Sequence, residues 1–235
     1  MNGISIIFED DYIIVLNKPS GAPTHMLRAD ETGTVVNFLL DHCPEIRGVG
    51  TNDLMSGLAH RLDTDTSGVV LAVKDNESFK NIRQQFREHK VIKEYLALVH
   101  GRYDGPKVIS NFIGNDPKKK KKVRVYPKEE KGARPAVTEI NEIMYYGNYA
   151  LLTLNIKTGV RHQIRAHLAY LGYPIVGDKI YQTAKMRESN PFGLNRHFLH
   201  ASKIGFSHPA TNKHVVFTSP LPEELNGILK KCSER

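Results

Sequence analysis

The sequence predicts an α+β protein with a mixed, largely antiparallel sheet and flanking helices. Three observations favour this class: strand patterns outnumber helical ones, several lie next to each other with turn residues between them, and helices do not separate them at regular intervals. A doubly wound parallel sheet would need that regular alternation. The 235 residues show no internal repeat, no Gly/Ser linker and no clear domain break, so we expect a single domain over residues 1–235.

The predicted strands are apolar or alternating runs bounded by turn residues. The first two flank acidic residues and are expected to form a hairpin, whereas the continuous apolar run at 69–73 indicates a buried strand. Gly147 and Asn148 join a later pair, and the turn at 209–212 joins the last. The strands are expected at residues 5–8, 12–17, 69–73, 94–99, 136–144, 149–156, 203–207 and 214–218.

Four helices are predicted from the spacing of apolar residues and from the residues that precede them. Thr34 and Asp75 are the expected N-caps of the first two, and Phe79, Ile82 and Phe86 share one face of the second. A row of cations beside that face is more typical of a solvated surface than of a binding site. This row consists of Lys80, Arg83, Arg87 and Lys90. The helices are expected at residues 34–42, 75–90, 160–171 and 221–231.

The composition favours an ordinary soluble globular protein, with 40% hydrophobic and 25% charged residues. No apolar run approaches the roughly 20 residues that a membrane span needs, and the first residues lack the basic region of a secretory signal. Cys43 and Cys232 are too few for a disulfide framework or a thiolate metal site. We therefore expect a cytoplasmic protein with no membrane partner.

The formal charge of +8 indicates a polyanionic partner. Most of it lies in a basic insertion at about 116–134, where nine basic and three acidic residues leave +6. This insertion is either a flexible arm that contacts phosphates or a solvated surface loop, and a nuclear-localisation patch is a further alternative. Its central run consists of Lys118, Lys119, Lys120, Lys121 and Lys122.

The most unusual stretch is the polar loop at 59–68, Ala-His-Arg-Leu-Asp-Thr-Asp-Thr-Ser-Gly, which leads into the buried strand. Functional groups often lie on such loops, although the same residues suit a tight turn bonded to its own backbone. It is not a kinase catalytic loop, because Leu62 precedes Asp63 and no Asp-Phe-Gly occurs. The chain has no His-Glu-x-x-His, no glycine-rich nucleotide loop and no P-loop, so we expect no metal and no cofactor.

The helix predicted at 160–171 begins with three cationic candidates: Arg161, His162 and Arg165. Cations in the first turns oppose the helix dipole. Either an anion, phosphate or carboxylate, lies close to them, or the arginines are simply solvated.

Several motifs in order along the chain resemble the RluA family of RNA pseudouridine synthases. Residues 60–68 are similar to its signature loop, His-Arg-Leu-Asp-x-x-Thr-Ser-Gly, and residues 158–167 to its Thr-Gly-Arg-x-His-Gln-Ile-Arg-x-His. The second motif departs at Val160, where the family usually has Arg, and Gln182 replaces the Gly of a Tyr-Gly pair. The other similar blocks are residues 17–21, 93–99, 172–178 and 199–201.

The resemblance implies the pseudouridine synthase fold and the isomerisation of uridines in structured RNA, either tRNA or rRNA, without cofactor or metal. It assigns Asp63 as the catalytic carboxylate, leaving open whether it attacks covalently or removes a sugar proton. Arg165 is the guanidinium that keeps this carboxylate ionised, and Tyr95 stacks on the base or transfers a proton. Arg61 is assigned to stabilising the flipped uridine.

The remaining RNA-binding candidates are Arg161, His162 and the five lysines at 118–122. The similar pattern begins at residue 5, so we expect the catalytic domain alone, without the S4 RNA-binding module that many members carry, and a monomer. A catalytically silent RNA-binding protein of the same fold is the alternative, and the presence of Asp63, Tyr95 and Arg165 together argues against it. An unrelated basic protein that binds any polyanion is a second alternative.

Overall fold

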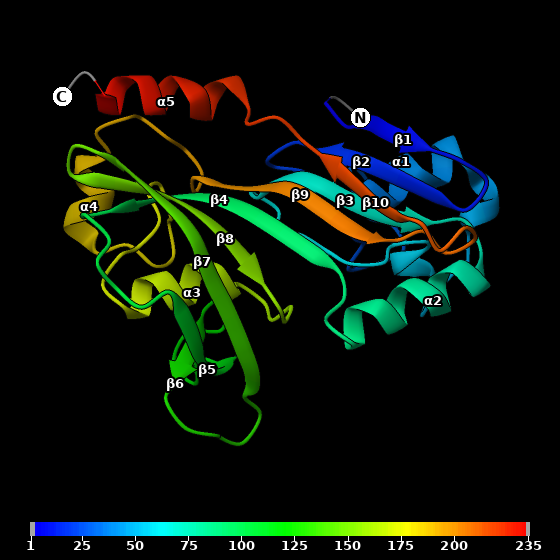
Figure 1. Cartoon of the computed structure of the whole chain (residues 1–235), viewed down its shortest axis with the longest axis horizontal. Coiled ribbons are helices and arrows are strands. Elements are labelled where there is room, and N and C mark those ends of the chain that lie inside the picture. The colour runs from blue at the N-terminus through cyan, green and yellow to red at the C-terminus, as the bar shows by residue number, and fades with distance from the viewer. Residues whose placement is uncertain (1–2, 234–235) are drawn as a thin grey trace. The chain divides into compact units, whose positions relative to one another are not determined.

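A computed structural model describes residues 3–233, and this part of the chain forms two compact units (Figure 1). The first comprises the described residues up to Ile92 together with Ala201–Pro220. The second comprises Lys93–His200 and the described residues from Leu221 onward. The expectation of a single domain over 1–235 stays a prediction.

The first unit is built on antiparallel strand pairs. Strands β1 and β2 form the predicted hairpin, β2 pairs with β3 so that Ile13 lies opposite Val73, and β9 pairs with β10. All seven residues of β3 are buried, as its continuous apolar run predicts. Gly68, with φ +120°, lets β3 approach Ala201, whose carbonyl a Cβ would strike. The strands are β1 Ser5–Glu9, β2 Ile13–Lys18, β3 Ser67–Val73, β9 Leu199–Ser207 and β10 His214–Thr218.

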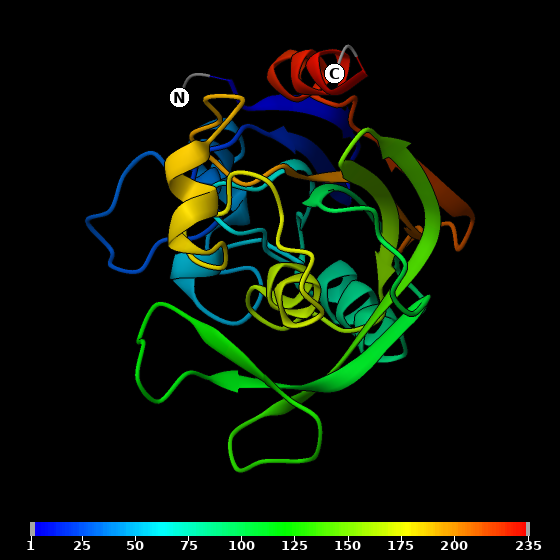
Figure 2. The ribbon, with the colours of Figure 1, turned by 90° about the vertical axis from the view of Figure 1, so that its left-hand side faces the viewer.

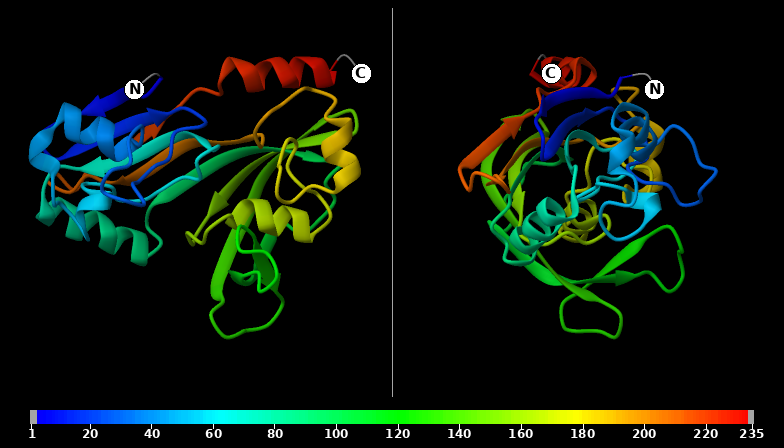
Figure 3. Two further views of the ribbon diagram at one scale, coloured as in Figure 1. Left: turned by 180° about the vertical axis from the view of Figure 1, so that it is seen from behind. Right: turned by 90° about the vertical axis from the view of Figure 1, so that its right-hand side faces the viewer.

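Two helices accompany these strands, α1 Val35–His42 and α2 Asn76–Arg87 (Figure 3). Both predicted N-caps are confirmed, since Thr34 accepts from Asn37 N and Asp75 from Ser78 N. Helix α2 ends at Arg87 rather than at residue 90, because His89 has a left-handed backbone with φ +57°. Between α1 and β3 the chain contains two short 3₁₀ turns, Pro44–Ile46 and Asp53–Met55.

The second unit has a sheet in the order β4-β8-β7-β5-β6, with antiparallel neighbours. Gly147 and Asn148 join β7 to β8 as predicted. No helix among the described residues is long and apolar enough to cross a membrane. The strands are β4 Ile92–His100, β5 Val108–Asn115, β6 Val123–Tyr126, β7 Arg134–Tyr146 and β8 Tyr149–Ile156. The helices are α3 Gln163–Tyr170, α4 Ala184–Ser189 and α5 Glu223–Ser233.

The basic insertion at 116–134 is not one flexible arm, because strand β6 lies in its centre. Val123 and Val125 are buried while Arg124 is exposed, and this alternation matches the period of a strand. The two valines pack with Ala166 of α3 in one apolar cluster. Figure 2 shows the ribbon of this segment, in green, below the yellow-green helix α3. Strand β5 and helix α4 were also not expected. The lysine run therefore forms a short turn between β5 and β6.

Helix α3 begins at Gln163, three residues later than predicted. His162 precedes it with φ +54°, a left-handed conformation that cannot continue an α-helix. Arg161 and His162 therefore lie in the preceding turn, and of the three cationic candidates only Arg165 lies inside the helix.

Candidate active site

The loop that carries Asp63 leads into β3, and a buried lysine holds it. The Lys18 side chain is fully buried, and its Nζ donates to Pro19 O at 2.9 Å and to Ala22 O at 2.8 Å within its own turn. A third hydrogen bond, 2.8 Å long, reaches Thr64 O. A buried ammonium is costly unless its protons are bonded, and these carbonyl oxygens meet that need. Lys18 therefore ties the turn after β2 to the residue that follows Asp63.

Further hydrogen bonds fix the chain on both sides of Asp63. Thr24 Oγ1 donates to Leu62 O at 2.7 Å and accepts from Leu62 N at 3.1 Å. Ser20 Oγ donates to Asp65 O at 3.0 Å. Because these bonds use main-chain atoms of the loop, they set the position of the half-buried Asp63 without depending on its carboxylate.

Helix α2 contacts the start of the same loop. The His60 ring lies 5.5 Å from the Phe86 ring, measured between centroids, and His60 Nε2 accepts from Leu71 N at 3.0 Å. Arg83 Nη1 donates to Ala59 O at 3.2 Å. These contacts give His60 a structural role between the helix and β3.

Strand β4 places Lys93 and Tyr95 on one face, because side chains two residues apart in a strand point to the same side. They are 8% and 6% exposed. Lys93 Nζ donates to Thr158 O at 3.2 Å. Burial and, to a smaller extent, the charge of Lys157 lower the pKa of Lys93 to about 8. An amine with that pKa can exchange a proton near neutral pH.

Helix α3 places Arg165 in a buried ion pair with Asp178. Arg165 is 5% exposed, its Nε donates to Asp178 Oδ2 at 2.7 Å and its Nη2 to Oδ1 at 3.0 Å. Burial raises the pKa of Asp178, but the hydrogen bonds and charge of Arg165 outweigh it, so that this pKa lies below its ordinary value. For Arg165, the anion expected near the start of this helix is therefore the carboxylate of Asp178.

A hydrogen-bond network fixes the turn before α3. Gln163 Oε1 accepts from Thr158 Oγ1 at 2.8 Å and from Val160 N at 3.1 Å. Gln163 Nε2 donates to Val137 O at 2.9 Å and to Thr138 Oγ1 at 3.1 Å, both on β7. The turn also receives the hydrogen bond from β4 described above, so β4, β7 and α3 are joined at this point.

The structure brings Arg161 and His162 to the turn that carries the lysine run. Arg161 Nη2 donates to Asn115 Oδ1 at 3.2 Å and to Lys122 O at 3.4 Å. His162 Nδ1 lies 3.2 Å from the Tyr181 hydroxyl oxygen, and Lys122 Nζ lies 4.9 Å from the centroid of the Tyr181 ring. The other lysines of the turn are exposed: Lys118, Lys119, Lys120 and Lys121.

The three predicted catalytic residues are divided between the units. Asp63 and the exposed Arg61 belong to the first, whereas Tyr95 and Arg165 belong to the second. Each has a defined position within its own unit, and the pairing of Asp63 with Arg165 stays a prediction. In the part of the chain that the structure describes, no group of three or more His, Cys, Asp or Glu side chains could hold a metal ion.

Residues 12–170 match the model of a protein family described as RNA pseudouridylate synthase. The chain belongs to this family. It is 36% identical over 219 residues to an uncharacterized RNA pseudouridine synthase of Chloroflexus aurantiacus, covering 93% of this chain and 66% of that protein. It is 33% identical over 231 residues to YlyB, an uncharacterized RNA pseudouridine synthase of Bacillus subtilis, covering 97% and 72%.

A further relative has a more specific name. The ribosomal large subunit pseudouridine synthase C of Buchnera aphidicola is 36% identical over 230 residues, covering 96% of this chain and 69% of that protein. Among solved structures, human RNA pseudouridylate synthase domain containing 4 aligns with a TM-score of 0.71 at 23% identity, over 96% of this chain and 93% of that chain. This similarity confirms the pseudouridine synthase fold.

Two residues that hold the candidate site residues in place were not identified from the sequence. Asp178 and Lys18 both lie within the motif blocks, at 172–178 and 17–21. A buried lysine or aspartate needs a partner, but Thr64 lies 46 residues from Lys18, and Arg165 lies 13 residues from Asp178. The motifs could have marked these residues, whereas their partners required the fold.

We expect the protein to lose stability in acid because of His167, the last residue of the 158–167 motif. Its side chain is fully buried, its Nδ1 lies 2.9 Å from Thr138 Oγ1, and burial lowers its pKa to about 4. Between pH 6.5 and pH 4 the unfolded chain binds a proton at His167 that the folded chain does not bind. The free energy of unfolding therefore decreases as the pH falls through this range. We expect a loss of about 2–3 kcal/mol between pH 7 and pH 4.5 that His167→Asn removes.

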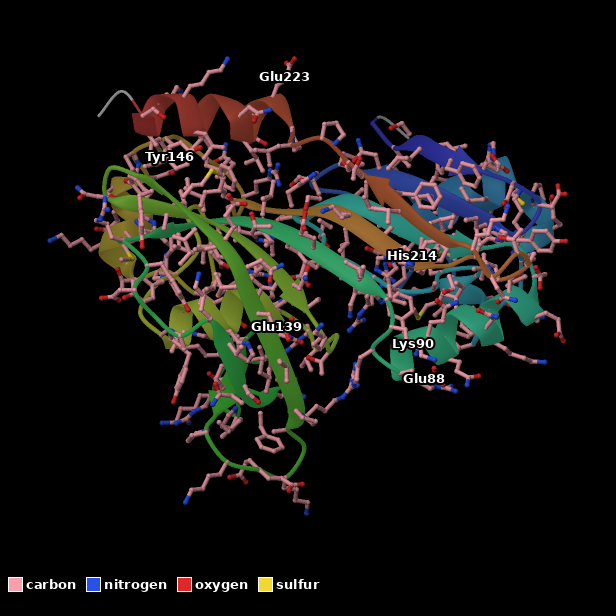
Figure 4. All side chains as sticks on the ribbon, in the orientation of Figure 1. Glu88, Lys90, Glu139, Tyr146, His214 and Glu223 are labelled. Atoms are coloured by element: carbon pink, nitrogen blue, oxygen red, sulfur yellow. The ribbon has the colours of Figure 1, made fainter. Side chains whose placement is uncertain are left out.

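Urea unfolding at the two pH values measures this difference. The control is His214→Asn, at an exposed position on β10 (Figure 4), which should keep the wild-type pH dependence. Equal pH dependences of the wild type and His167→Asn would contradict the prediction.

Proposed function

We propose that this protein is an RNA pseudouridine synthase that isomerises uridine to pseudouridine in structured RNA. The family match over residues 12–170 carries the proposal, because it includes the positions of Asp63, Tyr95 and Arg165. The relative from Buchnera aphidicola is named for the ribosomal large subunit. Large-subunit ribosomal RNA is therefore the first substrate to test, and transfer RNA is the second.

In this reaction the N1–C1′ bond of uridine breaks and a bond between C5 and C1′ forms, with a proton lost from C5 and one gained at N1. Product and substrate are isomers, so the chemistry needs no redox cofactor or group donor. We assign Asp63 as the carboxylate, acting either as a nucleophile or as the base that removes a sugar proton. Arg165 keeps it ionised, while Asp178 holds one edge of the guanidinium.

Two further assignments concern the target nucleotide. Tyr95, on its buried strand face, stacks on the uracil or transfers its proton. The exposed Arg61 stabilises the flipped state of the uridine, because the base must leave its stack to be reached. We also propose a monomer in the cytoplasm: one chain supplies all these residues, and Cys43 and Cys232 are free and buried, which suits a reducing compartment.

Tritium release tests the proposed function. Unmodified large-subunit ribosomal RNA and transfer RNA, each carrying tritium at uracil C5, are incubated separately with the purified protein. Forming the new C–C bond displaces the C5 hydrogen, so we expect release into water from one of the two RNAs. No release from either RNA, with RNA binding intact, would favour the catalytically silent binder.

Neutralising the exposed lysines of the β5–β6 turn should weaken RNA binding. We propose that these lysines contact phosphates, so that changing all four, at 118–121, to Gln lowers the salt dependence of binding. Each lost phosphate contact reduces the slope of log K against log salt by about 0.7–0.9. Filter binding over a salt series measures this slope.

The matched control also replaces four exposed lysines by Gln, at positions outside this turn. These are Lys107, Lys213, Lys230 and Lys231. An equal slope for the wild type and the turn variant, or an equal loss in the control, would show that the run is only a solvated surface.

A further inference from the structure

The row of cations on α2 contains two arginines without an acidic partner. Among the described residues, neither Arg83 nor Arg87 forms an ion pair. The two lysines of the row differ: Lys80 Nζ lies 3.6 Å from Glu77, and Lys90 Nζ lies 2.6 Å from Glu88 at the end of the helix (Figure 4). The lysines are thus neutralised within their own segment, whereas the arginines are not.

These arginines lie one helical turn apart, where side chains are neighbours and like charges repel. Arg83 is half-buried. Burial and the charge of Arg87 lower the pKa of Arg83. An anion that touches both guanidinium groups would relieve this repulsion, and a phosphate suits them because an arginine presents paired N–H donors to its oxygens.

The position of Arg83 indicates which anion this is. Arg83 Nη1 donates to Ala59 O, and Phe86 of the same helix contacts the His60 ring. Arg83 therefore lies against the chain that leads, four residues after Ala59, to Asp63, and Arg87 follows one helical turn later. An RNA strand that brings a uridine to Asp63 carries a phosphate on each side of that nucleotide, within the reach of neighbouring side chains.

We propose that Arg83 and Arg87 bind phosphates of the RNA strand next to the nucleotide presented to Asp63. This inference rests on the proposed function and extends it, since it adds a second RNA-binding surface, on the first unit, to the lysine turn of the second. An acidic protein partner would use the same cations, but the described residues of the first unit show nothing beside the Asp63 loop that favours a protein ligand. The test separates the two.

The test is the salt dependence of binding to an unmodified transcript of large-subunit ribosomal RNA. We expect Arg83→Gln/Arg87→Gln to lower the slope of log K against log salt by about 1–2 and to weaken binding about tenfold or more. The matched control is Arg28→Gln/Arg47→Gln, two exposed arginines of the same unit, and it should bind as the wild type does. An unchanged slope in the α2 variant would overturn the inference.

Arg83 also donates to a backbone carbonyl, so the double variant removes a contact with the loop as well as the charge. Arg87→Gln alone changes only the charge. We expect the single variant to lower the slope by about 0.7–0.9 and to raise KM for tritium release severalfold with kcat unchanged. A lower kcat with unchanged binding would overturn the phosphate role. If the wild type releases no tritium from any RNA, the proposed function fails, and if it is active but Arg87→Gln is indistinguishable from it, only this inference fails.

Discussion

Replacing Asp63 by Ala is expected to abolish tritium release while the protein stays folded and bound to RNA. The hydrogen bonds that fix the loop use main-chain atoms of Leu62, Thr64 and Asp65, so they survive the loss of the carboxylate. A turn bond from Thr66 N to Asp63 O, 3.0 Å long, also uses the main chain. Removing the reacting group of an enzyme lowers kcat on the order of 10⁴-fold or more.

The control for this substitution is Asp65→Ala, two residues further along the same loop. It removes the same charge from the same segment, and we expect it to retain turnover. Tritium release measures activity, and thermal melting and filter binding establish that both variants fold and bind RNA. Measurable turnover by Asp63→Ala would contradict the assigned mechanism. Full activity in both variants would favour a different carboxylate.

Replacing Lys18 by Met should destabilise the protein strongly. Methionine fills a similar volume but donates no hydrogen bond, so three carbonyl oxygens lose their common partner. A carbonyl oxygen that is left without its donor costs about 1–3 kcal/mol, and three of them are affected. We expect a loss of that size in the free energy of unfolding, measured in urea.

Lys18→Met should also lower the rate of tritium release, because the hydrogen bond from Lys18 to Thr64 O holds the residue that follows Asp63. The control is Lys213→Met, at an exposed position, where surface substitutions change stability by about 0.5 kcal/mol or less. A loss below about 1 kcal/mol for Lys18→Met would mean that water or neighbouring groups bond the carbonyls equally well.

The sequence predicted correctly those elements that depend on residues close to one another in the chain. The caps at Thr34 and Asp75 and the buried strand β3 follow from neighbouring residues, and the structure confirms them. Strand β6 was missed because its two buried valines lie among charged residues, and the alternation over four residues is short. The start of α3 was misplaced because the turn before it depends on Gln163, whose side chain bonds β7.

The candidate site divides in the same way. The positions of Asp63, Tyr95 and Arg165 were predicted from motifs, but the pair between Arg165 and Asp178 joins a helix to a loop and needs the fold to form. The burial of Lys18 likewise depends on contacts across the unit. Whether a charged side chain is buried, and which group it pairs with, depends on its tertiary neighbours. The periodicity of the sequence does not identify these neighbours.

The first unit takes its strands from both ends of the chain. Gln85 and Ser207 exchange hydrogen bonds of 2.7 and 2.8 Å, and Asn17 Oδ1 accepts from Ser219 Oγ at 2.9 Å. Over a hundred residues separate Ile92 from Ala201, so a ribosome adding 5–20 residues per second needs about 5–20 s between them. Strand β3 is hydrogen-bonded to β9 in the folded protein. During synthesis β3 therefore has an unpaired edge, which is a site for aggregation, until β9 emerges. The order of translation leaves this unit to close last, after the chain between its two halves has already been made.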